Sequence, residues 1–142
     1  MPGPDKAILE EWLPFVLKNA KISKDTVLIG HSSGCPLILS ILQNSDVQIK
    51  QAILVAGFID GSCDAILQKK YNWEKIKRNV KDLVFINSDN DPWGCDDKQG
   101  LKMFYHLGGT LILRHGEGHM GSDKFNQPYK EFPLLLKLIK VS

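Results

Sequence analysis

The residues of this sequence best suited to covalent chemistry lie in the stretch 30–34, which reads Gly-His-Ser-Ser-Gly. The apolar run 26–29 comes directly before it and the amphipathic run 36–42 follows it, so the pattern predicts a strand, a tight turn and a helix. A turn of this kind is strained and exposes the hydroxyl of its central residue, Ser32. That serine is therefore a candidate nucleophile for acyl transfer.

The residues around this serine complete the expected turn. We expect Gly30 and Gly34 at places where a Cβ atom would collide with the neighbouring backbone. The start of the helix offers free N–H groups and the positive end of a dipole, which both favour negative charge. The N–H of Ser33 is therefore the predicted donor to an oxyanion. A plainer interpretation, in which Ser32 only caps the helix, stays open.

A nucleophilic serine needs a histidine as base, and the base needs an acid that orients it. Two predicted strands, 83–88 and 110–114, are followed directly by such side chains, and parallel strands bring their C-terminal ends to one edge of a sheet. The candidates are Asp89, Asp91, His115 and His119. Residue types alone leave the choice within each pair open, and an acid in a turn or a histidine in an exposed loop is the plainer interpretation.

Several short motifs spread along nearly the whole chain point to a known family. They occupy residues 11–15, 30–34, 72–77, 88–92 and 118–119. Together they resemble the small serine hydrolases of the retinoblastoma-binding protein nine type. The resemblance implies an α/β-hydrolase fold with Ser32 as nucleophile, Asp91 as acid and His119 as base. Asp91 is preferred to Asp89 because the family acid directly precedes a proline. His119 is preferred to His115 because the family histidine follows a glycine.

The chain departs from the family pattern at its front. Family members have a strand, a glycine-rich loop and a second strand before the helix that carries the Trp-Leu-Pro motif, whereas here residues 1–4 come just ahead of it. The first βα loop supplies one oxyanion donor in this fold, so we expect a low activity. We also expect the strand 26–29 at an edge of the sheet, without the lysines or prolines that usually protect an edge. We expect one of three outcomes for that edge. Two copies dimerise through it, residues 1–6 or the first helix fold across it, or the protein aggregates.

The remaining sequence alternates regularly between helical and strand patterns. Helices are predicted at 7–18, 33–43, 73–78, 98–107 and 128–139, and strands at 26–29, 51–56, 83–88 and 110–114. Pro14 predicts a kink in the first helix or a short second helical piece. The stretch 58–71 has no clear period and predicts a loop or lid. The alternation predicts a three-layer α/β-hydrolase-like fold, with a mostly parallel sheet of about four strands flanked by helices, in a single domain over residues 1–142.

Composition excludes several classes of protein. A chain of 142 residues with 43% hydrophobic and 24% charged residues is ordinary for a folded domain, and its net charge of +2 is spread along the sequence, which argues against a nucleic-acid partner. Cys35, Cys63 and Cys95 are odd in number and far apart, which favours reduced thiols and a cytoplasmic location. No apolar run approaches the ~20 residues that cross a bilayer, and no signal peptide is evident.

Two further motifs suggest cofactors but lack the necessary context. Residues 116–121 fit the pattern GxGxxG, yet no strand follows the final helix, so the βαβ unit that binds a dinucleotide cannot close. His115 and His119 are four residues apart, which would suit a metal ion on a helix. The glycines around them argue against a helix, and no cysteine or acid has convincing ligand spacing. We therefore expect neither an organic cofactor nor a metal.

The sequence leads to one function and one alternative from a different class. The predicted function is a serine hydrolase that cleaves a small ester, thioester or amide through an acyl-enzyme, with Phe58, Trp93 and Met120 binding the substrate. The alternative is a catalytically weak or inactive hydrolase-fold protein that acts as an interaction module with a protein partner.

Overall fold

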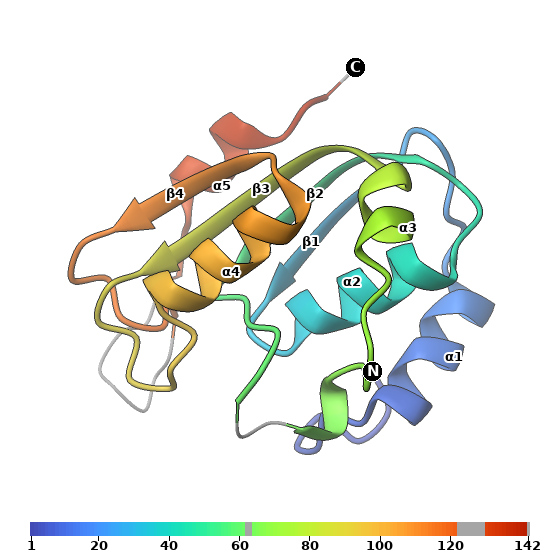
Figure 1. The fold of residues 1–142 in the computed structure, drawn as a ribbon, viewed down its shortest axis with the longest axis horizontal. Coiled ribbons are helices and arrows are strands. Elements are labelled where there is room, and N and C mark those ends of the chain that lie inside the picture. The colour runs from blue at the N-terminus through green and yellow to red at the C-terminus, as the bar shows by residue number, and fades with distance from the viewer. Residues whose placement is uncertain (62–63, 122–129, 142) are drawn as a thin grey trace.

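The protein folds around one parallel sheet (Figure 1), and its computed structural model describes residues 1–61, 64–121 and 130–141. The strands are β1 (Val27–His31), β2 (Ile49–Val55), β3 (Val80–Ser88) and β4 (Thr110–Arg114), in the order β1-β2-β3-β4. All three neighbouring pairs are parallel, so their C-terminal ends lie at one edge of the sheet. The predicted parallel α/β architecture is confirmed, and the single domain over residues 1–142 stays a prediction.

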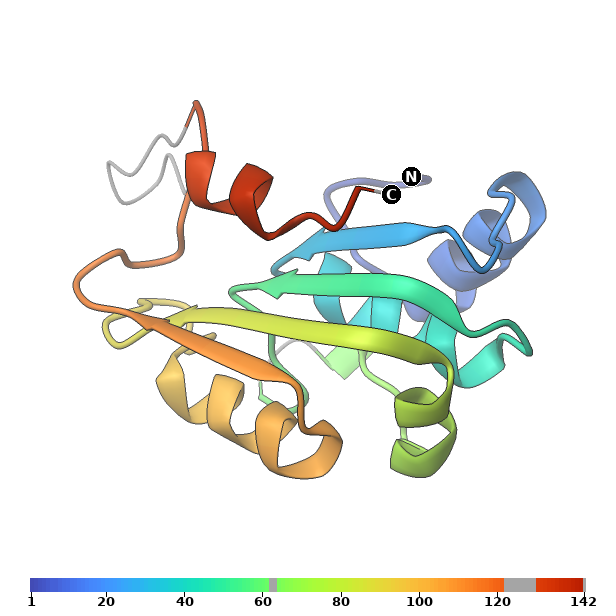
Figure 2. The ribbon, with the colours of Figure 1, turned by 90° about the horizontal axis from the view of Figure 1, so that it is seen from above.

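Helices flank this sheet on both faces (Figure 2). The helices α2 (Gly34–Asn44), α3 (Trp73–Arg78) and α4 (Asp97–Leu107) lie on one face, and α5 (Pro133–Leu138) lies on the other. The first helix, α1 (Leu9–Asn19), packs against α2 and against the short 3-10 helix η1 (Asp64–Ile66). None of the described helices is long and apolar enough to cross a membrane.

The alternation of side chains along β3 explains why both faces are covered. Phe85 is fully buried and belongs to a core cluster with Leu39 of α2 and Met103 of α4. Its neighbour Ile86 points to the opposite face, into a second cluster against which Leu135 of α5 packs. Because neighbouring residues of a strand point to opposite faces, an apolar run such as β3 requires a helix on each side.

The predicted elements agree with the observed ones to within a few residues, except at the last helix. The short second helical piece predicted at Pro14 is wrong, because α1 runs through this residue. The carbonyl of Glu10, which loses its helical partner there, belongs to an exposed residue. A kink at Pro14 stays a prediction. The last helix begins at Pro133 rather than at residue 128, because proline suits the first turn of a helix. Residues 128 and 129 lie outside the described part of the chain.

The strand β1 lies at the edge of the sheet, as predicted. Within the described ranges its only strand partner is β2, and Ile29 is 45% exposed. The N-terminal residues fold back onto α1, where Trp12 Nε1 donates to the carbonyl of Pro2 at 2.7 Å. Pairing of two copies through this edge stays a prediction, which a dispersed monomer in size-exclusion chromatography would contradict.

Candidate active site

Ser32 occupies a strained turn between β1 and α2. Its φ of 53° is positive, a conformation that costs free energy in a non-glycine residue and that persists only where the surrounding structure imposes it. The N–H of Ser32 donates to the carbonyl of Val55 at 2.9 Å, which continues the pairing of β1 with β2 by one residue. The sheet therefore holds the serine at its C-terminal edge, where the sequence predicted it.

The two glycines of the turn differ from each other. A Cβ at Gly30 would lie 2.7 Å from the carbonyl oxygen of Gly34 and 2.8 Å from Ile38 Cδ1, so only glycine fits there. A Cβ at Gly34 would meet nothing within 4 Å. The prediction for Gly34 is therefore wrong, because this residue supplies the crowding carbonyl while its own Cβ position faces open space.

The residues that follow Ser32 differ in their contacts with the turn. The thiol of Cys35 is fully buried and lies 3.3 Å from the carbonyl of Gly30 and 3.2 Å from that of Val55. Burial raises the pKa of Cys35 well above its ordinary value, so it stays a protonated, structural thiol. Ser33 is the N-cap of α2, at the positive end of the helix dipole. Its role as the oxyanion donor stays a prediction.

Asp91 and His119 form a buried hydrogen-bonded pair. His119 Nδ1 lies 2.7 Å from Asp91 Oδ2, and the two side chains are 8% and 0% exposed. The N–H of Trp93 donates to the other oxygen, Asp91 Oδ1, at 2.8 Å. An ionised carboxylate only accepts hydrogen bonds, so Nδ1 carries the proton and the lone pair of the neutral ring lies on Nε2. The aspartate thereby fixes both the orientation and the tautomer of the histidine.

The loop after β3 also holds the backbone that leads to this histidine. Asn90 Oδ1 accepts from the N–H of Gly118 at 2.7 Å and from Ser88 Oγ at 2.8 Å, and Ser88 Oγ accepts from the N–H of Glu117 at 3.0 Å. These contacts place His119 through its two preceding residues. Sequence reasoning missed the roles of Ser88 and Asn90, because an acceptor for a distant backbone N–H leaves no spacing pattern.

Asp89 and His115 form a second pair of the same types, but in solvent. His115 Nδ1 lies 2.5 Å from Asp89 Oδ2, and the side chains are 96% and 40% exposed. Hydrogen bonds from the Gly116 N–H and from His115 lower the pKa of Asp89. The same carboxylate raises the pKa of His115. The structure thus separates the two candidate pairs by their burial.

His31 connects the serine turn to the loop that carries His119. His31 Nε2 lies 2.7 Å from the carbonyl of His119, and the two ring centroids are 4.8 Å apart. A carbonyl only accepts, so His31 Nε2 carries a proton and donates it. Burial lowers the pKa of His31, although the hydrogen bond opposes this shift. A neutral His31 adds no positive charge beside His119.

A pocket of about 360 Å³ opens beside Ser32, and Phe58, Trp93 and Cys95 are among its lining residues. Its size falls within the range of small-ligand sites. The Trp93 ring centroid lies 6.3 Å from that of His119, so Trp93 reaches both the pocket and the histidine. Met120, the third predicted substrate contact, lines a separate hollow beside β1 and α5.

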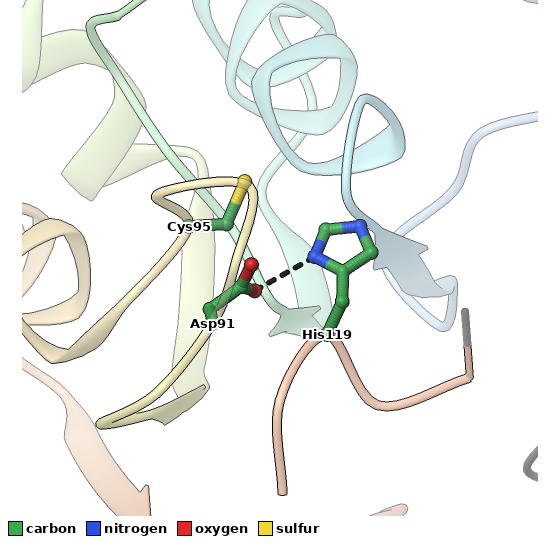
Figure 3. A group of neighbouring side chains, drawn as sticks. All are labelled: Asp91, Cys95 and His119. Atoms are coloured by element: carbon green, nitrogen blue, oxygen red, sulfur yellow. Dashed lines mark hydrogen bonds and ion pairs between the residues drawn. The ribbon is translucent and has the colours of Figure 1, made fainter. Parts of the chain in front are cut away.

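Cys95 lies next to the buried pair and adds a third side chain that could ligate a metal ion. The ligand atoms of Asp91, Cys95 and His119 all lie within 4.8 Å of one another, and all three residues are buried (Figure 3). The sequence showed Asp91 and Cys95 four residues apart but gave no sign that their loop turns both side chains toward His119. Of the predicted reduced thiols, Cys35 and Cys95 form no disulfide bond within the described residues, and Cys63 lies outside them.

Taken together, a strained serine, a buried aspartate–histidine pair and a parallel sheet define an α/β hydrolase type of protein. The chain matches the serine hydrolase family over residues 3–139 and belongs to it. The family resemblance drawn from the sequence motifs is confirmed, and the chain is a hydrolase.

Individual relatives agree with this assignment. The chain is 27% identical over 133 residues to "Serine hydrolase RBBP9" of Rattus norvegicus, covering 89% of this chain and 70% of the relative. It is 32% identical over 99 residues to "Putative hydrolase YdeN" of Bacillus subtilis, covering 64% of this chain and 52% of that protein, about half its length.

Solved structures show the same fold. The structure of the ydeN gene product of B. subtilis has a TM-score of 0.84 at 25% identity, covering 97% of this chain and 76% of that one. A putative YdeN-like hydrolase of Pectobacterium atrosepticum has a TM-score of 0.69 at 18% identity, covering 94% of this chain and 68% of that one.

Proposed function

We propose that Ser32, His119 and Asp91 form a catalytic triad that hydrolyses a small ester, thioester or amide through an acyl-enzyme. The observation that carries this proposal is the buried 2.7 Å hydrogen bond from His119 Nδ1 to Asp91 Oδ2. It leaves the lone pair of the imidazole on Nε2, which is the arrangement that a general base for serine requires. The positive φ of Ser32 supports the proposal independently.

In this mechanism His119 Nε2 accepts the Oγ proton while Ser32 Oγ attacks the substrate carbonyl. The N–H of Ser33, at the start of α2, stabilises the oxyanion of the tetrahedral intermediate. His119 then gives the proton to the leaving group, and the acyl chain stays on Ser32 until a water, deprotonated by the same histidine, releases it. Asp91 stabilises the imidazolium that forms in both steps.

The pocket beside Ser32 suggests a small acyl group. Phe58 and Trp93 offer apolar surface for it, and we propose both as substrate contacts. The carboxylate of Asp60, which also lines the pocket, is neutralised by Lys102 at 2.7 Å and bonded by Gln99 at 2.6 Å. The negative charge of Asp60 is therefore compensated at the pocket. A neutral small-molecule substrate fits this arrangement best.

Covalent labelling with a fluorophosphonate probe tests the proposal, with hydrolysis of a short-chain p-nitrophenyl ester measured beside it. We expect the wild type to be labelled and Ser32→Ala to lose labelling. The matched variant Ser33→Ala keeps its backbone N–H and should keep much of the labelling. Equal labelling of Ser32→Ala and wild type would overturn the assignment of the nucleophile.

The same measurements address the alternative function. A folded wild type that neither reacts with the probe nor turns over the ester would favour the non-catalytic interaction module with a protein partner. The low activity expected from the sequence and the cytoplasmic location stay predictions. Steady-state rates and localisation of the tagged protein test them.

A further inference from the structure

We infer that Asp91, Cys95 and His119 form an inhibitory site for one thiophilic divalent cation, with Zn²⁺ as the ion that the donor set fits best. The three side chains offer a carboxylate oxygen, a thiol sulfur and an imidazole nitrogen, which are the three kinds of ligand that hold Zn²⁺ in proteins. Figure 3 shows the sulfur of Cys95 and the Nδ1 side of the His119 ring both next to the Asp91 carboxylate. Cys95 also lines the pocket beside Ser32, which gives an ion a route from solvent.

The spacing of the donors is close to what a bound ion needs. Tetrahedral Zn²⁺ with ordinary bond lengths separates its ligand atoms by about 3.4–3.6 Å. The Asp91 Oδ2 to His119 Nδ1 distance of 2.7 Å must open, and no pair of ligand atoms is more than 4.8 Å apart. The separations therefore change by at most about 1.4 Å from those limits to the spacing around Zn²⁺, which rotation of the side chains can provide. The Trp93 N–H can keep its bond to Asp91 Oδ1 meanwhile, as an outer partner that orients the ligand.

Charge also balances at this site. A buried ion needs compensation, and Zn²⁺ bound by one carboxylate, one thiolate and one neutral imidazole has a net charge of zero. The thiol of Cys95 gives its proton to solvent on binding. The His119 ring keeps one proton, which leaves Nδ1 when the metal binds there and resides on Nε2. Only coordinate bonds form, so no oxidant or reductant is required.

The consequence for catalysis rests on the proposed triad. With the metal on Nδ1, the proton on Nε2 removes the lone pair that would accept the proton of Ser32. Asp91 is at the same time withdrawn from its role as the orienting acid. The metal-bound protein is therefore inactive even if the pocket stays open, and removal of the ion restores the base.

Binding is tested without reference to activity. Cd²⁺ added to the metal-free protein is expected to produce a thiolate-to-metal charge-transfer band that saturates at one equivalent, and Zn²⁺ should displace it with release of about one proton per ion. Cys95→Ser should lose the band and weaken Zn²⁺ binding by more than the roughly 10–100-fold typical of losing an outer-sphere partner. The matched variants Cys35→Ser and His115→Ala should retain both. If Cys95→Ser does not fold, loss of the Cd²⁺ band in Asp91→Asn serves the same purpose.

Ester hydrolysis then separates this inference from the proposed function. Zn²⁺ should inhibit the wild type, EDTA should restore it, and Cys95→Ser should be inhibited far less relative to its own metal-free rate. Absence of the band in the wild type, or its persistence in Cys95→Ser, overturns the metal site while leaving the triad intact. Activation by Zn²⁺ overturns the inhibitory role. A band in a protein that hydrolyses nothing upholds the metal site and refutes the proposed function.

Discussion

Two histidine–aspartate pairs join the same two loops of this protein through the same atoms, yet one pair is buried and the other is exposed. His119 and Asp91 are bonded at 2.7 Å with side chains 8% and 0% exposed, whereas His115 and Asp89 are bonded at 2.5 Å with side chains 96% and 40% exposed. In both pairs Nδ1 faces a carboxylate Oδ2. Hydrogen-bond geometry therefore cannot be what distinguishes a candidate catalytic pair from a surface ion pair.

Burial and neighbouring groups make the difference. The inner pair lies beside the pocket that Ser32 and Trp93 line. A buried hydrogen bond is stronger because the local dielectric constant is low. The outer pair is surrounded by water, where ion pairs contribute little. A site should therefore be recognised by what surrounds its titratable groups, and residues of one type in two surroundings should respond differently to the same substitution.

The largest expected difference is between the two aspartates. Asp91→Asn should lower kcat for ester hydrolysis by about 10⁴-fold, because the amide no longer selects the imidazole tautomer that leaves Nε2 as the base. Asp89→Asn changes an exposed side chain away from the inner pair, so it should alter the rate by about twofold or less. Steady-state kinetics on the same ester measure both. Equal losses in the two variants would show that burial does not separate the pairs.

A smaller loss should follow from loosening the loop that carries the inner pair. Asn90→Ala removes the acceptor for the Gly118 N–H and lets His119 shift. A displacement of about 1 Å can cost about 10²-fold in rate, so we expect kcat to fall by about 10–100-fold while KM changes little. Asn90→Asp keeps an acceptor oxygen at Oδ1 and should recover most of the rate. A higher KM with an unchanged kcat would contradict a positioning role.

The two glycines of the serine turn offer the same kind of comparison for stability. In Gly30→Ala the new Cβ would meet backbone atoms at 2.7 Å, and such overpacking costs about 1–3 kcal/mol in the free energy of unfolding. In Gly34→Ala the Cβ meets nothing, and alanine in place of a helical glycine stabilises by up to about 1 kcal/mol. Chemical denaturation curves measure both changes. A stable Gly30→Ala protein would show that the turn is less rigid than its contacts indicate.

These contrasts also explain how far the sequence could predict the molecule. The strand and helix patterns were sufficient for the sheet, because apolar runs separated by amphipathic ones have few arrangements, and α3 and β4 were predicted to the residue. The preference for Asp91 and His119 came from the family resemblance, and the structure places the two side chains together. The proximity of Cys95, the contacts of Asn90 and the open space at Gly34 depend on how loops fold in three dimensions. No spacing in the sequence encodes them.

The smallest expected effect belongs to the outer pair and depends on pH. The pKa of His115 is raised above 6.5 by Asp89, so its contribution to stability is full below pH 6.5 and is lost as the pH rises through the raised value. The pKa of Asp89 is lowered below 3.8, chiefly by the Gly116 N–H and by His115, so its contribution is full above pH 3.8 and is lost at lower pH. The pair therefore stabilises the fold most between these limits.

Thermal unfolding of the wild type and His115→Ala measures this window. The difference in Tm should be largest near about pH 5.5 and should shrink by about pH 9, where the imidazole is neutral and only its Nδ1–H bond to Asp89 remains. It should also shrink at pH 5.5 in ~1 M salt, because exposed charges are screened there. A difference that is equal at both pH values would show that His115 stabilises the loop through packing rather than charge. The outer pair would then resemble the inner pair more closely than its exposure suggests.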